Sequence, residues 1–105
     1  MYTVTVLYPQ PVDAAEFDRY HDQTHIPIAT RMKGQTRWTA QRIEQREQAT
    51  PPYHFIVQLS APTKAALQQI LDSPEGVAAA LDVPNFATGG AVFLYGEQDE
   101  IIPPP

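Results

Sequence analysis

The sequence predicts one α+β domain, in which two helices pack on one face of a four-stranded antiparallel sheet. Two observations lead to this class. Four segments are rich in β-branched and aromatic residues that tend to alternate, and two others carry apolar residues at helical three- and four-residue steps. Their order is βαββαβ, the ferredoxin-like arrangement. The chain has 105 residues, enough for one domain, which we place at 1–97. An acidic, proline-ended tail follows at 98–105, and we expect it to be exposed or to lie on a partner.

The first strand and the first helix have clear boundaries. Residues 2–8 form the strand, and Pro9 ends it because proline cannot donate to a sheet ladder. A helix over 14–23 follows. The Asp13 side chain can accept hydrogen bonds from the free backbone N–H groups at the start of this helix, and Glu16 completes a capping-box-like pattern.

The region after the first helix is expected to be irregular. Pro27 has no N–H and biases its predecessor away from helical angles, so we expect a break and a separate turn at 27–32. A strand of mixed polarity at 35–45 and a clearly alternating strand at 53–60 then form a hairpin across a polar loop.

The last third predicts two short helices and one strand. Pro62 is placed in the first turn of a helix that runs to residue 71, where proline is tolerated. An Ala-rich helix restarts at 74–81 with Ser73 as its cap. Residues 82–90 are expected to be a loop, and 91–95 the last strand.

The predicted strands at 2–8, 53–60 and 91–95 have apolar or aromatic side chains on both faces. An antiparallel sheet with one wet face should instead alternate between apolar and polar residues. Two such sheets related by a two-fold axis would bury their second faces against each other. We therefore expect a homodimer. The alternative is a monomer with a few exposed apolar residues.

Composition argues against several classes of function. The net charge is −5, with 12 acidic and 7 basic residues, which argues against nucleic-acid binding. There is no cysteine, so disulfides, thiolate metal sites and a cysteine nucleophile are excluded. The N-terminal segment has neither a basic stretch nor a long apolar run, so we expect no signal peptide, no membrane span and a cytoplasmic location.

His25 is the first candidate catalytic residue. Imidazole titrates near neutral pH and can pass a proton in either direction. Its position just before Pro27, at an expected irregular helix end, lets it face a cleft. The alternative is a ring that bonds to local backbone and holds the loop. Tyr20, five residues earlier, could bind a substrate oxygen or orient the imidazole, or be a core tyrosine with its hydroxyl at the rim.

His21 and His25 are spaced as two metal ligands on a helix would be. Asp22, however, stands where the zincin pattern needs Glu, and the nearest further candidate, His54, lies on a distant strand. We therefore expect no metal, and we expect His21 to be solvated.

Aromatic residues could line an apolar pocket for a hydrophobic ligand, although ordinary packing would also explain each of them. Trp38, Phe55 and Phe86 are the candidate substrate-binding residues; Phe86 could cover the pocket mouth. Arg42 could pair with a substrate carboxylate, or be a surface charge. We find neither a glycine-rich phosphate loop nor a serine nucleophile elbow, so no organic cofactor is expected.

Residues 17–28, with Phe17, Tyr20, His25 and Pro27, resemble a segment of the EthD family. The runs 73–76 and 84–90 extend the resemblance, which covers nearly the whole chain to about residue 97. It implies the dimeric α/β-barrel superfamily, in which two ferredoxin-like subunits form one barrel from their sheets. Members include muconolactone isomerases, polyketide cyclases, quinol-forming monooxygenases and haem-degrading enzymes.

The resemblance favours a small catabolic enzyme with cofactor-independent proton-transfer chemistry, of isomerase, cyclase or lyase type. The ligand would be a hydrophobic, oxygen-bearing compound, with His25 as general acid or base and Tyr20 as its hydrogen-bonding partner. Two alternatives stay open. One is a non-catalytic ligand-binding or accessory protein of a degradation pathway, as for ethyl tert-butyl ether. The other is a haem- or oxygen-linked monooxygenase.

Overall fold

A computed structural model describes residues 1–103. It contains four strands, four α-helices, one π-helical segment (η1) and one 3₁₀ turn (η2). In chain order they are β1 (Tyr2–Pro9), α1 (Ala14–Tyr20), η1 (His21–His25), α2 (Ile26–Ala29), β2 (Arg37–Arg42), β3 (Tyr53–Ala61), α3 (Lys64–Asp72), α4 (Pro74–Asp82), η2 (Val83–Asn85) and β4 (Val92–Glu97).

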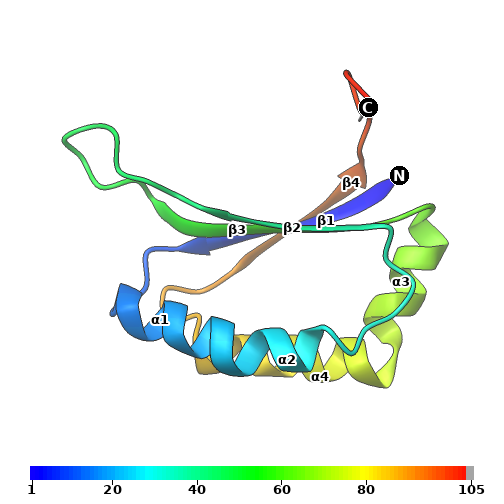
Figure 1. Ribbon diagram of the computed structural model, residues 1–105, viewed down its shortest axis with the longest axis horizontal. Helices are drawn as coiled ribbons and strands as arrows, with labels where there is room; N and C mark the ends of the chain where they lie inside the picture. Colours follow the sequence, from blue (N-terminus) through cyan, green and yellow to red (C-terminus); the bar gives the residue numbers. More distant parts are fainter. Residues whose placement is uncertain (104–105) are drawn as a thin grey trace.

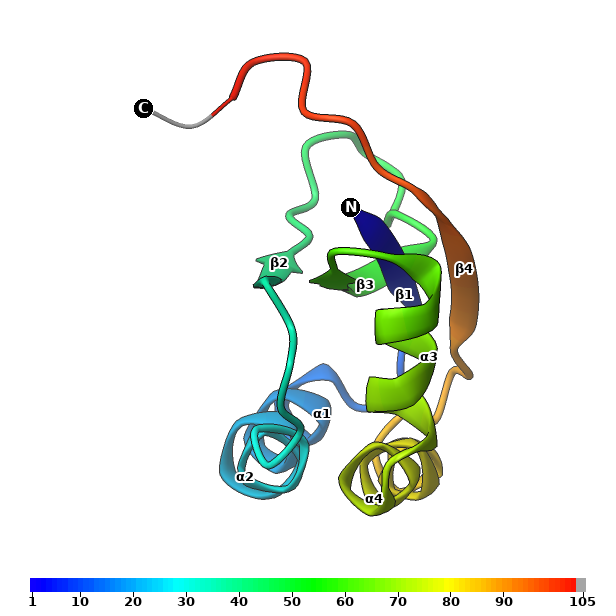
Figure 2. The ribbon, with the colours of Figure 1, turned by 90° about the vertical axis from the view of Figure 1, so that its right-hand side faces the viewer.

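The four strands form one antiparallel sheet in the order β2-β3-β1-β4. This order and the βαββαβ sequence confirm the predicted ferredoxin-like fold. The helices lie on one side of the sheet (Figure 1). The continuous α1–η1–α2 segment and α4 lie side by side beneath it, and α3 rises steeply from α4 to the sheet (Figure 2). We call the other side of the sheet the outer face.

Local capping explains most of the helix boundaries. The Asp13 side chain accepts from the Glu16 N–H at 3.1 Å, as expected. The start of α3 was predicted wrongly: Thr63 caps it by accepting from the Ala66 N–H, so Pro62 precedes the helix. Ser73 ends α3 and caps α4, as expected, so the chain turns sharply between the two helices.

The edge strands differ from their predicted lengths because hydrogen-bonded pairing with the neighbouring strand sets where each one ends. β2 is shorter than expected, since it pairs only with β3, from Arg37 opposite Ser60 to Arg42 opposite Phe55. β4 is longer and continues through Gly96 to Glu97, which lies opposite Tyr2 of β1.

The core lies between the sheet and the helices. Alternate residues of β1 and β3 point from the sheet into this layer and meet buried side chains from the helices and the α4–β4 connection. The main core residues are Val4, Val6, Tyr8, Phe55 and Leu59 from the sheet, with Phe17, Leu67, Ile70, Ala79 and Phe86 from the other side. No helix within residues 1–103 is both long enough and apolar enough to cross a membrane.

The outer face differs from the expected apolar surface. Thr3 and Ser60 form a buried pair on it, with their hydroxyl oxygens 2.7 Å apart. Thr5 also accepts from the Gln58 amide there, at 3.2 Å. Apolar side chains dominate only toward the far end, where Leu7 of β1 lies opposite both a β3 and a β4 residue. The outer face thus carries apolar side chains, as expected, but a buried polar pair occupies its opposite end.

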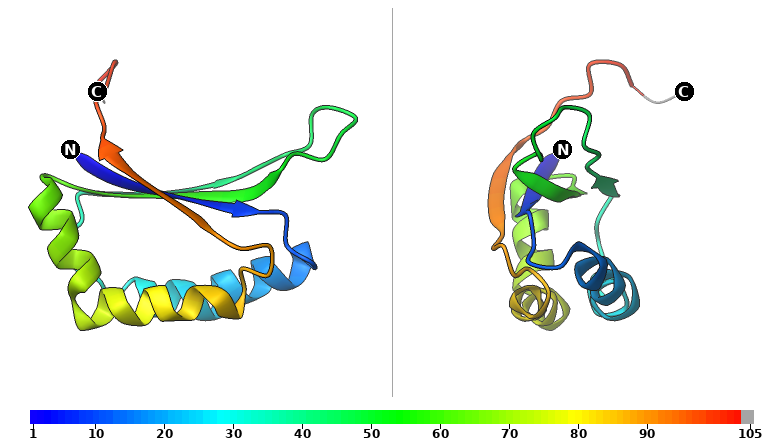
Figure 3. Two further views of the ribbon diagram at one scale, coloured as in Figure 1. Left: turned by 180° about the vertical axis from the view of Figure 1, so that it is seen from behind. Right: turned by 90° about the vertical axis from the view of Figure 1, so that its left-hand side faces the viewer.

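The tail was expected to be exposed or to lie on a partner, but its first residues bind this chain's own sheet. The Gln98 N–H donates to the Met1 carbonyl at 2.8 Å, and its side-chain oxygen accepts from the Thr3 hydroxyl. Beyond Gln98 the chain passes over the outer face (Figure 3), and Glu100 lies 3.5 Å from Arg37. Residues 104 and 105 of the predicted tail lie outside the described residues.

Candidate functional site

The candidate site begins with a helix that does not break. The backbone stays helical from α1 through η1 into α2, so the expected break at Pro27 was wrong. Within η1 the hydrogen bonding is π-helical, and the Ile26 N–H donates to the His21 carbonyl, five residues back. The chain widens just before Pro27, whose ring would otherwise meet the carbonyl four residues earlier. Such π-turns occur frequently at functional sites.

The wide π-helical turn changes which side chains project from the same side of the helix. On an α-helix, Tyr20 and His25 would point apart, because residues three or four positions apart are neighbours. In the π-turn they bind one carboxylate. The Tyr20 hydroxyl donates to Asp82 Oδ1 at 2.7 Å, and His25 Nδ1 lies 2.9 Å from Asp82 Oδ2.

Asp82 is the centre of this cluster and is 7% exposed. The Asn85 amide also donates to Oδ1, at 3.0 Å. Burial alone would raise the pKa of the Asp82 carboxyl, but the hydrogen bonds from Tyr20, Asn85 and His25 outweigh it and hold the pKa below its ordinary value. The same bond to Asp82 raises the pKa of the Tyr20 hydroxyl, which therefore stays protonated.

The ionised Asp82 carboxylate fixes the tautomer of His25. A carboxylate only accepts hydrogen bonds, so the 2.9 Å contact requires a proton on Nδ1. In the neutral ring the other nitrogen, Nε2, then carries a free lone pair. His25 therefore has one nitrogen held by Asp82 and one available to accept or return a proton.

His25 lines a cavity of ≈ 90 Å³ between the sheet and the helices. The walls are largely apolar and come from both layers: Val4, Val6, Tyr8, Trp38, Val57, Leu59 and Phe93 from the sheet, and His21, Ile26, Ala29, Met32, Ala79, Ala80 and Val83 with His25 from the other side. More than half of these wall residues are buried, whereas Phe93 is 44% exposed, so the cavity is an apolar recess in which charges are screened less than at the surface.

His21 is a second imidazole on this cavity wall, although we expected it to be solvated. It is 3% exposed, and its ring centroid lies 5.4 Å from that of His25. Aromatic rings surround it, including Phe55 at 4.7 Å and Phe86 at 5.4 Å between centroids. Burial lowers the pKa of His21, and the neighbouring His25 lowers it further, so His21 is neutral at pH 7.

The structure brings some of the candidate residues together and separates others. His25 and Trp38 line the cavity. Tyr20 and Phe86 instead line a separate pocket of ≈ 200 Å³, although the buried Phe86 ring packs 4.6 Å from His25 between centroids. Phe55 is a core residue that packs on His21.

Arg42 lies opposite the core residue Phe55, on the helix-facing side of β2, but its side chain is 74% exposed and lies 4.0 Å from the Asp22 carboxylate. Neither Phe55 nor Arg42 lines the cavity, and the roles of all six candidates stay predictions. Among residues 1–103 there is no group of three or more side chains that could hold a metal ion.

Asp82 is the site residue that the sequence analysis missed, because we assigned residues 82–90 to a loop. A signal was present. Gly76, Ala79 and Asp82 are spaced by three and form the buried stripe of α4, so the stripe ends on a carboxylate. A charged residue that continues an apolar helical stripe indicates a buried and bonded group.

The fold and this Tyr–Asp–His cluster beside an apolar cavity define a small ferredoxin-like α+β protein. A profile of the EthD domain matches residues 9–90. The chain therefore belongs to the EthD family, as the resemblance in its sequence implied.

Relatives agree with this assignment. An uncharacterised 11.0 kDa protein from the thcB–thcC intergenic region of Rhodococcus erythropolis is 34% identical over 103 residues, covering 98% of this chain and 100% of the relative. The crystal structure of an EthD family protein from Bacillus halodurans has a TM-score of 0.87 at 25% identity, covering 94% of this chain and 99% of the other.

More distant structures share the fold alone. One is SnoaB, a cofactor-independent oxygenase from Streptomyces nogalater, with a TM-score of 0.65, 16% identity and coverage of 98% and 96%. Another is a dimeric ferredoxin-like protein of unknown function from Jannaschia, with a TM-score of 0.63, 18% identity and coverage of 92% and 97%.

Proposed function

We propose that this protein is a small-molecule enzyme that transfers protons without an organic cofactor. In this proposal His25 Nε2 takes a proton from, or returns it to, a hydrophobic oxygen-bearing compound bound in the cavity. Asp82 acts through His25 and is a positioning residue. The reaction class would be isomerisation, cyclisation or elimination, in which one placed side chain contributes about 10²–10⁴-fold.

One observation carries this proposal. His25 is held at Nδ1 by a buried carboxylate while its ring lines an apolar cavity. The arrangement is that of a general base with an orienting acidic partner. Core packing does not require it, because an apolar side chain would fill the same volume without burying an ionised group.

The cavity size limits the ligand. At ≈ 90 Å³ it holds about three water molecules, whereas pockets for drug-sized ligands span roughly 300–1,000 Å³. The ligand is therefore small, or it displaces rim side chains on entry. Trp38 and Phe93 line the cavity and are partly exposed, so they are the side chains best placed to move.

A second candidate is a cofactor-independent oxygenase, as SnoaB from Streptomyces nogalater is described. Such a reaction would begin with the same proton abstraction, so the site chemistry favours it as well. Oxygen consumption during turnover, measured with an oxygen electrode, separates the two candidates. A ligand-binding or accessory protein would instead bind a compound tightly and leave it unchanged.

The test compares the wild type with His25→Gln on a panel of lactones, polyketides and quinones. Circular dichroism checks that the variant is folded. His54→Gln is the matched control, since His54 also contacts an aspartate, at 2.8 Å, but lies outside the cavity wall. Turnover that His25→Gln abolishes and His54→Gln retains supports the proposal. Equal rates in all three proteins would refute the role of His25.

We also propose that the protein is a homodimer. Exposed apolar side chains on β4, including Val92 and Leu94 on the outer face, support this assembly, and a dimeric ferredoxin-like protein shares the fold. Sedimentation of a dilute sample as a particle of 11.7 kDa would contradict it. The cytoplasmic location and the lack of nucleic-acid binding stay predictions.

A further inference from the structure

The two ends of the outer face differ in chemistry. At the end where β1 begins, Thr3, Ser60 and Arg37 lie in one row across β1, β3 and β2. At the opposite end, Leu7 of β1 lies between two apolar neighbours, Ile56 of β3 and Val92 of β4. We call these two regions the polar end and the apolar end.

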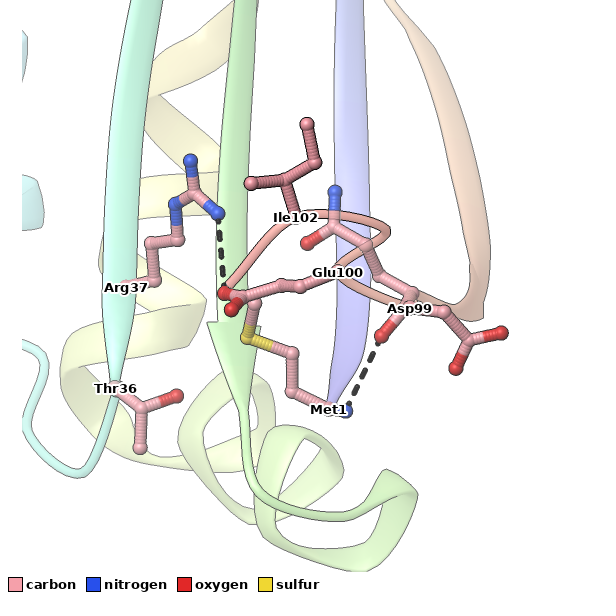
Figure 4. Close-up of a pocket in the computed structure, with 7 residues that line it drawn as sticks. Met1, Thr36, Arg37, Asp99, Glu100 and Ile102 are labelled. Carbon is pink, nitrogen blue, oxygen red and sulfur yellow. Dashed lines mark hydrogen bonds and ion pairs between the residues drawn. The ribbon is translucent and has the colours of Figure 1, made fainter. Parts of the chain in front are cut away.

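The tail covers only the polar end. It is anchored at Gln98 and then stands away from the sheet, and a hollow of ≈ 780 Å³ remains between them (Figure 4). Glu100 reaches Arg37 across this hollow. The next two residues, Ile101 and Ile102, are 91% and 87% exposed. Two consecutive, almost fully exposed isoleucines lie beside a sheet face on which the apolar side chain of Val92 is 39% exposed.

The outer face alone would give a small dimer interface. Four strands about 4.8 Å apart, with roughly six residues each at 3.3 Å, span a flat area of roughly 400 Å². A standard interface buries about 800 Å² of accessible surface on each partner, and side chains make the accessible surface of a face larger than its flat area. An exposed apolar segment next to the face would enlarge the contact, and the tail is such a segment.

We propose that Ile101 and Ile102 of each subunit pack on the apolar end of the partner's outer face. The occupant of this surface is thus a second copy of the chain. The inference rests on the proposed homodimer and goes beyond it, because it fixes how the strands of one sheet are oriented relative to those of the other. The two-fold axis runs across the strands, so that the polar end of one sheet faces the apolar end of the other.

Charge distinguishes this packing from its alternative. A two-fold axis parallel to the strands would place the two tails against each other. Asp99 of one tail would then face Asp99 of the second tail, and like charges at close range repel; the Glu100 charge is offset by Arg37, 3.5 Å away. A two-fold axis across the strands keeps the two acidic tails apart and places Ile101 and Ile102 of each tail against apolar side chains of the partner.

The chain has no cysteine, so cross-linking can test this packing without background. Subunits with Ile102→Cys are mixed with subunits carrying Val92→Cys and are oxidised after subunit exchange. We expect cross-linked mixed dimers, in several-fold excess over either homotypic product. The matched control pairs Ile102→Cys with Leu81→Cys, an exposed position on α4 in the helical layer, and is expected to give no product.

The outcomes of the cross-linking experiment distinguish failure of the tail placement from failure of the homodimer. Dimers that sediment normally but cross-link mainly as Ile102–Ile102 pairs, or not at all, overturn the tail placement and leave the homodimer standing. A monomer in sedimentation overturns both proposals. Abundant mixed product supports both.

A second measurement does not depend on cysteine geometry. Replacing Ile101 and Ile102 with serine removes apolar surface that the partner should bury, so we expect the dimer dissociation constant to rise roughly tenfold or more. The control replaces Val77 and Leu81, both exposed on α4, with serine. An equal dissociation constant for the tail variant and the wild type would contradict the proposal.

Discussion

Within residues 1–103, two histidine–aspartate pairs are joined at hydrogen-bond distance, and their surroundings differ; a third pair, His21 and Asp22, is further apart at 3.6 Å. His25 and Asp82 are both almost fully buried, and His25 lines a cavity. The side chains of His54 and Asp18 are 17% and 48% exposed, and the His54 ring rests edge-on against Phe17, 5.0 Å away between centroids. The distances are nearly equal, 2.9 and 2.8 Å.

A histidine–aspartate hydrogen bond alone therefore does not define a site. Solvent near His54 and Asp18 screens the pair, and such pairs contribute about 0–1 kcal/mol. Around Asp82 the protein supplies three hydrogen-bond donors in place of water, so the carboxylate stays ionised in a buried position. Only the buried pair holds an imidazole at an apolar cavity.

The largest expected difference between the pairs is in turnover. Once a substrate is found, His25→Gln should lower kcat about 10²–10⁴-fold, because the group that transfers the proton is lost. His54→Gln should leave kcat close to that of the wild type. Steady-state kinetics measure both, and a comparable loss in the two variants would remove the distinction between the pairs.

The second difference is in stability. Asp82→Ala leaves the donors of Tyr20, Asn85 and His25 without an acceptor, so it should lower the free energy of unfolding by about 3 kcal/mol. Asp18→Ala breaks the more exposed pair and should cost less than about 1 kcal/mol. Urea denaturation at pH 7 compares the two. Equal losses would mean that the Asp82 cluster is no better formed than the surface pair.

A smaller effect is the pH dependence caused by His21. Burial lowers its pKa, so the unfolded chain takes up a proton at a higher pH than the folded chain does. Its contribution to stability is present above the unfolded value of about 6.5 and is lost as the pH falls through it, by at most about 1.4 kcal/mol per pH unit.

Denaturation at a series of pH values from 7.5 downward measures this slope. His21→Phe should flatten it, and His54→Gln should retain the contribution of His21. A His21→Phe variant with the same acid-side slope as the wild type would show that His21 is not held neutral.

The smallest expected effects concern ligand binding. Trp38 is the one tryptophan of the chain and lies on the cavity wall, so its fluorescence should change as a ligand enters.

Arg42→Ala should leave the binding constant of that ligand nearly unchanged, because Arg42 is exposed and lies outside the cavity wall. A ligand that binds tightly without changing Trp38 emission, or whose binding requires Arg42, would move the site away from this cavity.

The order of strands and helices along the chain and the positions of most helices followed from local patterns. Alternation identified β1 and β3, and Ser73 and Asp13 were recognised as caps because their side chains act within three residues. Strand ends were less predictable, since β2 and β4 end where their partners do. The polar outer face was visible in Thr3, Thr5 and Ser60, but we gave more weight to the apolar side chains on it.

The candidate site could be predicted only in part. His25 and Tyr20 were identified, but the π-turn that directs both toward one carboxylate depends on how the chain accommodates Pro27. Asp82 lies 57 residues from His25 in the sequence. Local patterns contain no information about such a contact.

The central claim is that Asp82 holds the proton of His25 on Nδ1 and leaves Nε2 free for chemistry. Long-range ¹H–¹⁵N spectra of ¹⁵N-labelled histidine, assigned with single variants of the three histidines, test it most directly. Above neutral pH, His25 should carry its proton on Nδ1 in the wild type, and Asp82→Asn should remove that preference. A His25 ring protonated on Nε2 in the wild type would contradict the account.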